Sequence, residues 1–229
     1  MKRLFFLATV ISILSFGSLA SAQGIAAWEA SATSAGAGFI AKDISAPTQM
    51  DIGEYALDTG GGVTYEFVFN ADVRGASSAF MGSLSAPAGD SAGLKFDQWN
   101  NTGTYGATAF GVADYTSGVA HAVNTDAHAV FVADGTNIDL YVNGAFAETM
   151  ADASFALSGI TGLGHAYNHG NEGSVDPLNG TLLGVAVYDS ALSADAIQAN
   201  FDAFVPEPNA SLMSVMALAG LLAAARRRR

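Results

Sequence analysis

Two histidines four residues apart form the pattern in this sequence most typical of a metal site. His165 and His169 lie in Gly164-His-Ala-Tyr-Asn-His-Gly170. On a helix, residues at i and i+4 share one face and can hold a zinc ion together. Glycine and asparagine surround this pair, however, and both residue types favour turns. We therefore expect a loop here rather than a histidine metal site. The other two histidines, His121 and His128, flank a strand boundary and are expected to be structural.

Nucleophilic catalysis finds little support in the sequence. It contains no cysteine, which excludes disulfides, thiolate zinc sites and cysteine nucleophiles. Four histidines among many serines and aspartates produce Ser/His/Asp combinations by chance, so a triad is not indicated.

A segment rich in aromatic and amide side chains is the best candidate for sugar recognition. Phe96-Asp-Gln-Trp-Asn-Asn-Thr-Gly-Thr-Tyr105 places amides between two aromatic rings. Aromatic faces stack on sugar rings, and amides donate and accept hydrogen bonds to hydroxyls. The predicted carbohydrate-binding residues are Trp99, Asn100 and Tyr105, with Tyr115 and Tyr167 as weaker candidates of the same type.

The same segment has a purely structural alternative. In that interpretation Trp99 lies in the core, and Asn100 and Asn101 turn the chain. The two interpretations differ in what they require. Sugar binding requires an exposed aromatic side chain beside a polar groove, whereas the structural role requires a buried Trp99 and no pocket.

Aspartates near predicted loops are candidates for calcium ligands. Calcium takes six to eight oxygen ligands, mostly carboxylates and carbonyls. The candidates are Asp114, Asp126 and Asp176. None of them belongs to an EF-hand-like spacing. The alternative is that each is a solvated loop residue or a turn former.

The charge is distributed unevenly along the chain. Its formal net charge is −12, yet six of the nine cations are Lys2, Arg3 and the four arginines 226–229. Residues 23–205 contain three cations and 20 acids, a net charge of −17. Such a field repels phosphate backbones, which excludes nucleic acid as a partner. The same negative charge favours divalent cations as ligands.

The N-terminus is typical of a secretory signal peptide, predicted over residues 1–22. Lys2 and Arg3 form the positively charged region, and an apolar run follows from Leu4 to Leu14. Ala20-Ser21-Ala22 supplies the small residues of a cleavage site, so Gln23 is the expected mature start. The alternative, an uncleaved anchor helix, is less favoured because the apolar run is short for a membrane span.

The C-terminus, residues 205–229, combines three features in order. Pro206-Glu207-Pro208 is followed by a mostly apolar stretch from Ala210 to Ala225 and then by Arg226, Arg227, Arg228 and Arg229. As a helix the stretch would span about 24 Å, slightly less than the roughly 30 Å of a hydrocarbon core. The arginine cluster is expected to stay cytoplasmic, which places the acidic domain outside.

This tail resembles the PEP-CTERM sorting signal of Gram-negative bacteria. The resemblance implies recognition by an exosortase, a membrane transpeptidase-like enzyme. It also implies transient insertion into the inner membrane and delivery to the cell surface or extracellular matrix. An ordinary membrane anchor is the alternative. Neither interpretation says what the domain does there.

Between the two ends, short alternating runs predict β-strands. Val63 to Asn70 alternates apolar and polar residues, and the runs 128–133, 137–142 and 145–150 are separated by Asp134-Gly135 and Asn143-Gly144. These dipeptides are typical of hairpin turns, so the three runs predict a meander. A later strand is expected over Thr181 to Tyr188.

One short helix is predicted after the last strand, from Ala194 to about Ala203. Ser193 is the expected N-cap, and Asp195 lies in the first turn. Leu192 and Ile197 have the spacing of a hydrophobic staple. Many short strands and one helix predict an all-β antiparallel sandwich or jelly roll over residues 23–204. The apolar tail would add a C-terminal anchor helix.

Three segments of the chain resemble laminin-G-like domains of the concanavalin A-like lectin/glucanase superfamily. They are His128 to Gly144 with its "Asp-Gly-Thr" and "Leu-Tyr-Val-Asn-Gly", Gly180 to Ile197 with its "Ala-Leu-Ser", and the early segment Tyr55 to Phe69. Together they span about 140 residues in the expected order. The resemblance implies a concanavalin A-like jelly roll that often holds calcium and recognises glycans or proteins at its rim.

Some members of this superfamily are retaining glucanases with a Glu-x-Asp-x-x-Glu strand. No glutamate in this chain is followed two residues later by aspartate, so that site is absent. We therefore expect a noncatalytic, surface-sorted domain that binds matrix polysaccharide or exopolysaccharide, with calcium as a candidate cofactor. The alternatives are a structural or adhesive protein-binding matrix component and, less favoured, a polysaccharide-active enzyme.

Overall fold

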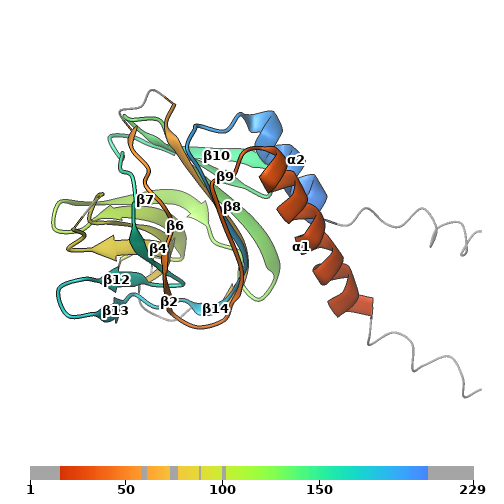
Figure 1. Cartoon of the computed structure of the whole chain (residues 1–229), viewed down its shortest axis with the longest axis horizontal. Helices are drawn as coiled ribbons and strands as arrows, with labels where there is room; N and C mark the ends of the chain where they lie inside the picture. The colour runs from red at the N-terminus through yellow and green to blue at the C-terminus, as the bar shows by residue number, and fades with distance from the viewer. Residues whose placement is uncertain (1–15, 58–60, 73–76, 88, 100–101, 206–229) are drawn as a thin grey trace, which may run out of the picture.

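Two β-sheets, antiparallel except for one parallel strand pair, pack face to face, and two helices lie side by side on the outer face of one sheet (Figure 1). This architecture comes from a computed structural model, which describes residues 16–57, 61–72, 77–87, 89–99 and 102–205. The predicted all-β antiparallel sandwich is confirmed. The apolar C-terminal stretch lies outside the described residues. Within the described part of the chain, no helix is both long and apolar enough to cross a membrane.

The first sheet carries the helices and has six strands in the described residues. Their spatial order is β1 (Phe39–Ile44), β14 (Asn179–Tyr188), β3 (Val63–Asp72), β8 (Asp126–Ala133), β9 (Ile138–Val142) and β10 (Ala145–Met150). The last three strands form the predicted meander. Asn143 and Gly144 between β9 and β10 have φ angles of 50° and 79°, as a tight two-residue hairpin turn requires.

The second sheet has eight strands in the described residues. Its main path runs through β13 (Gly173–Val175), β12 (Ala166–Asn168), β4 (Ser78–Leu84), β5 (Ala92–Asp97), β6 (Thr104–Ala109) and β7 (Ala113–Ala120). β11 (Ile160–Leu163) pairs with both β4 and β2 (Thr48–Asp51).

The core between the sheets is strongly aromatic. The rings of Phe67 on β3 and Phe80 on β4 stack with their centroids 4.8 Å apart across the sandwich. Phe96 and Tyr105 join them from β5 and β6. Because strand side chains alternate between faces, each core residue on β5 and β6 is followed by one that points away from the core. That outward set positions the site described below.

The predicted C-terminal helix is confirmed as α2, Ala194–Phe204. The Ser193 Oγ accepts a hydrogen bond from the backbone N–H of Ala196 at 3.3 Å, so it is the N-cap. Ile197 is fully buried, and Leu192 packs with it against Val130 on β8. This contact is the expected hydrophobic staple.

A second helix, α1 (Phe16–Ser34), was not predicted. It continues across the expected cleavage boundary after residue 22 and packs against α2 and β14. Its sequence is rich in small residues and lacks an apolar stripe with helical spacing, so no local pattern indicated a helix there. Tertiary contacts of Trp28, which is fully buried, hold it in place.

A buried carboxylate joins both helices to the first sheet. Glu66 on β3 is fully buried on the outer face of the sheet and accepts four hydrogen bonds. The donors are Trp28 Nε1 at 2.7 Å, His128 Nε2 at 2.7 Å, Asn200 Nδ2 at 2.9 Å and the Tyr188 hydroxyl. Burial alone raises the pKa of Glu66, but hydrogen bonds and the charge of His128 outweigh it and hold this pKa below its usual value.

Trp28 reaches Glu66 across a glycine on β14, and this contact yields a stability prediction. A Cβ at Gly184 would lie 2.5 Å from Trp28 Cζ3, so the indole or the strand would have to shift to make room for it. We expect Gly184→Ala to lower the free energy of unfolding by about 1–3 kcal/mol through overpacking. The measurement is urea-induced unfolding of the two proteins.

Gly61→Ala is the matched control. The nearest atom to a Cβ at Gly61 would be 3.7 Å away, an ordinary van der Waals distance. We expect this substitution to leave stability unchanged or slightly raised, because alanine reduces the entropy of the unfolded chain. Equal unfolding midpoints for both variants would show that Trp28 does not pack on β14.

Candidate functional site

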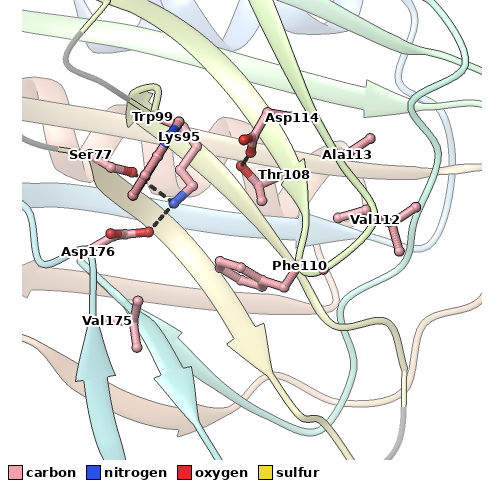
Figure 2. Close-up of a pocket in the computed structure, with 12 residues that line it drawn as sticks. Ser77, Lys95, Trp99, Thr108, Phe110, Val112, Ala113, Asp114, Val175 and Asp176 are labelled. Atoms are coloured by element: carbon pink, nitrogen blue, oxygen red, sulfur yellow. Dashed lines mark hydrogen bonds and ion pairs between the residues drawn. The ribbon is translucent and has the colours of Figure 1, made fainter.

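A pocket of about 540 Å³ opens on the second sheet, on the face directed away from the core. This volume falls in the range of small-molecule sites. Figure 2 shows its side chains, which come from segments far apart in the sequence. The lining residues are Ser77, Lys95, Trp99, Thr108, Ala109, Phe110, Gly111, Val112, Ala113, Asp114, Val175 and Asp176.

Strand alternation explains why these residues share one face. On β5, Leu94 and Phe96 belong to the core, so Lys95 between them projects outward. On β6, Ala107 is in the core and Thr108 projects outward. The β6–β7 register then places Asp114 directly opposite Thr108. The floor of the pocket is therefore specified by the pairing of three adjacent strands.

Lys95 is a buried cation whose charge is balanced in place. Its side chain is 2% exposed and forms an ion pair with Asp176. Its Nζ also donates to Ser77 Oγ at 3.1 Å and lies 5.2 Å from the centroid of the Phe110 ring. Figure 2 shows the ammonium enclosed between these partners.

A buried glutamine supports the aromatic side of the pocket. Gln98 donates to the carbonyls of Ala107 at 2.7 Å and Tyr115 at 3.1 Å, which ties it to β6 and β7. Its Oε1 accepts from the backbone N–H of Trp99 at 2.8 Å and from Thr108 Oγ1 at 3.2 Å. The backbone of Trp99 is thus anchored to the same strands that form the floor.

Trp99 projects into solvent at the rim of this pocket. It is 60% exposed, and Val112 on the opposite turn is 82% exposed. The interpretation with Trp99 in the core is therefore wrong. An exposed aromatic side chain lies beside a polar pocket, which is the arrangement that sugar binding requires.

The three predicted sugar-binding tyrosines are absent from the described lining of the pocket. The prediction that Tyr105 binds sugar is wrong, because this residue is fully buried in the core. Its hydroxyl accepts a hydrogen bond from the Ala122 N–H at 3.1 Å, and burial raises its pKa to about 12. Tyr115 packs partly buried against the core, and Tyr167 is buried with its ring 4.7 Å from that of His169. Asn100 lies outside the described residues.

Two of the three predicted calcium ligands meet at the pocket. Asp114 accepts from Thr108 Oγ1 at 2.8 Å, and Asp176 pairs with Lys95. Asp126 lies on the other sheet, where it accepts from Asn70 Nδ2 at 2.7 Å. The described residues contain no group of three or more His, Asp or Glu side chains that could hold a metal ion.

The histidines have structural positions. His165 is buried and donates from Nδ1 to the carbonyl of its neighbour at 3.1 Å, and burial lowers its pKa. His169 Nε2 lies 2.9 Å from Ser83 Oγ. The segment between them forms strand β12 rather than the expected loop. His121 stacks on Phe96 with the ring centroids 4.4 Å apart.

Sequence reasoning missed the polar floor of the pocket, namely Lys95, Thr108 and Ser77. One signal was available for the first of these. Lys95 is one of three cations in residues 23–205, and it interrupts an apolar alternation between Leu94 and Phe96. A lysine at such a position requires a partner, because burying an unpaired charge is costly.

Comparison with known families and structures agrees with this architecture. A family model described as the concanavalin A-like lectin/glucanases superfamily, Laminin_G_3, matches residues 45–198. This range runs from just before β2 into α2 and contains every residue of the pocket. No curated protein sequence matches the chain at a significant level.

The solved structures that are similar to this chain include CBM40 carbohydrate-binding modules. The CBM40 of the Ruminococcus gnavus IT-sialidase bound to α2,3-sialyllactose has a TM-score of 0.52 and 19% identity, and the match covers 72% of this chain and 98% of that one. The same module bound to α2,6-sialyllactose has a TM-score of 0.53 and 18% identity, with 72% and 100% covered.

A third similar structure is the K499G mutant of the NanB sialidase from Streptococcus pneumoniae. Its TM-score is 0.51 and its identity 16%, and the match covers 71% of this chain but 28% of that larger protein. At these identities the resemblance concerns the fold.

Proposed function

Because this chain belongs to the concanavalin A-like lectin/glucanase superfamily, we propose that it is a noncatalytic carbohydrate-binding domain whose site is the Trp99 pocket. The observation that carries the proposal is the exposure of Trp99, 60%, beside a pocket with a polar floor. Sugar rings stack on indole faces, and polar side chains beside the indole can bind the sugar hydroxyls.

The polar floor supplies the second requirement of sugar recognition. Thr108, Asp114, Ser77 and Asp176 present hydroxyl and carboxylate oxygens that can exchange hydrogen bonds with sugar hydroxyls. The Thr108–Asp114 hydrogen bond and the contacts of Lys95 with Ser77 and Asp176 fix their orientation before the ligand arrives, which lowers the entropic cost of binding. The sialyllactose complexes of the similar CBM40 modules agree with glycan binding on this type of sandwich.

Two observations favour a noncatalytic role. The superfamily's Glu-x-Asp-x-x-Glu pattern is absent from the sequence. In the pocket, the Asp176 carboxylate is paired with the Lys95 ammonium. Glycoside hydrolysis needs one carboxyl to act as an acid and a second as nucleophile or base across the scissile bond.

We propose that the domain acts outside the cell, on matrix polysaccharide or exopolysaccharide. The support is the signal-peptide pattern of residues 1–22 and the tail that resembles an exosortase signal. Residues 1–15 and 206–229 lie outside the described part of the structure, so exosortase recognition and transient membrane insertion rest on sequence alone.

A glycan array probed with and without a chelator tests the function. We expect binding to at least one polysaccharide class. A silent array at high protein concentration would contradict the proposal and favour the protein-binding alternative. The chelator decides the calcium prediction, which names Asp114, Asp126 and Asp176: calcium dependence predicts loss of signal, whereas an unchanged signal would remove calcium from the account.

A further inference from the structure

The charged groups that line the pocket carry a net negative charge. Among its described residues they are one cation, Lys95, and two carboxylates, Asp114 and Asp176. The surrounding segment 23–205 has a net charge of −17, which adds to the same field. A ligand that enters the pocket therefore meets negative potential.

Lys95 does not offset this field for an incoming anion. It is 2% exposed, and Asp176, Ser77 and the Phe110 ring already surround its ammonium group. A sugar carboxylate would have to displace Asp176 to reach it. That exchange would leave a partly buried carboxylate without its partner, at a large cost in free energy.

Asp114 is in the opposite situation. It lies exposed on β7, and one of its oxygens, Oδ1, accepts from Thr108. Its charge has no cationic partner among the described residues that line the pocket. Trp99 at the same pocket adds an exposed aromatic face, to which cations are attracted.

We infer that the pocket selects amino sugars with a free ammonium group and excludes sugars that carry a carboxylate. The ammonium is stabilised by the Asp114 carboxylate and by the face of Trp99, while the sugar ring stacks on the indole. The Lys95–Asp176 ion pair stays intact as part of the pocket floor. This inference rests on the proposed function, since it names the sugar class for the same pocket.

The test compares two oligosaccharides that differ only in acetylation. Glucosamine oligomers and N-acetylglucosamine oligomers of equal length are titrated calorimetrically at a mildly acidic pH, where the amine is protonated and aspartate ionised. We expect the glucosamine oligomer to bind about fivefold to tenfold more tightly, from one ion pair in a solvent-accessible pocket. An oligogalacturonate of the same length should bind more weakly than either.

Two variants separate the pocket from the general acidity of the domain. Asp114→Asn keeps the acceptor for Thr108 but removes the charge, and it should abolish most of the preference. Asp202→Asn removes an equal charge from the exposed face of α2 and should leave the preference intact.

Equal or tighter binding of the N-acetylated or the galacturonate oligomer would overturn the inference while leaving sugar binding in place. A preference that survives Asp114→Asn would do the same. Absence of binding by every sugar, here and on the array, is a different result, because it would overturn the proposed function itself.

Discussion

Trp99→Ala is expected to weaken sugar binding about thirtyfold, which corresponds to roughly 2 kcal/mol for loss of a central aromatic contact. The indole is 60% exposed in the free protein, so its removal takes away ligand contact area rather than core packing. We therefore expect the free energy of unfolding to change little. Calorimetric titration with the polysaccharide identified on the array measures the first effect, and urea unfolding the second.

Phe146→Ala is the matched control for this substitution. Phe146 is a comparably exposed aromatic residue, 56%, but it lies on β10 in the other sheet and outside the pocket. Its removal should leave the Kd unchanged. Equal weakening by both variants, or none by Trp99→Ala, would show that the sugar binds elsewhere. Trp99→Phe should retain part of the affinity, because a smaller aromatic face remains.

Glu66→Gln is expected to destabilise the fold by about 3–5 kcal/mol, the range for breaking a buried charged network. Four donors converge on this carboxylate, and the amide of glutamine would turn an NH₂ group toward some of them. The substitution should loosen α1 and α2 together, because Trp28 and Asn200 belong to these two helices.

Glu29→Gln on α1 provides the control. Glu29 forms an ion pair with Lys42, and both side chains are 38% exposed. Solvent-exposed pairs contribute at most about 1 kcal/mol, so this variant should unfold close to the wild type. Similar losses in the two variants would contradict the central role assigned to Glu66.

The Glu66 network also predicts a direction for acid unfolding. The pKa of Glu66 is lower in the folded protein than in the unfolded chain. Its contribution to stability is therefore complete above the unfolded value of about 4.3 and is lost as the pH falls through the folded pKa. Thermal melting midpoints should fall below that pH in the wild type. In Glu66→Gln the melting midpoint should decrease less steeply as the pH falls.

Local patterns explain why five strands of the first sheet and the helix α2 could be predicted, whereas no strand of the second sheet was. The meander depends on Asn143 and Gly144, and α2 on Ser193, Leu192 and Ile197; these signals lie within a few residues of the element they specify. The helix α1 could not be predicted in this way. It depends on Trp28 meeting Glu66, 38 positions later in the chain, in a contact that only the folded sheet creates.

The site was predictable only in part, for the same reason. Trp99, Asp114 and Asp176 were identified by residue type, and the pocket brings all three together. Tyr105 was misassigned because its strand, β6, turns it into the core and turns Thr108, three residues later, outward. Lys95 was missed because its partner Asp176 is 81 residues away.

The most direct test of sugar binding at this pocket follows the two tryptophans of the chain. Trp28 is fully buried and Trp99 is 60% exposed, so a neutral quencher such as acrylamide reports on Trp99. Titration with a polysaccharide identified on the array should progressively protect the fluorescence from quenching and follow the calorimetric binding curve. Unchanged quenching at saturating polysaccharide would contradict the account, because the ligand would then be bound away from Trp99.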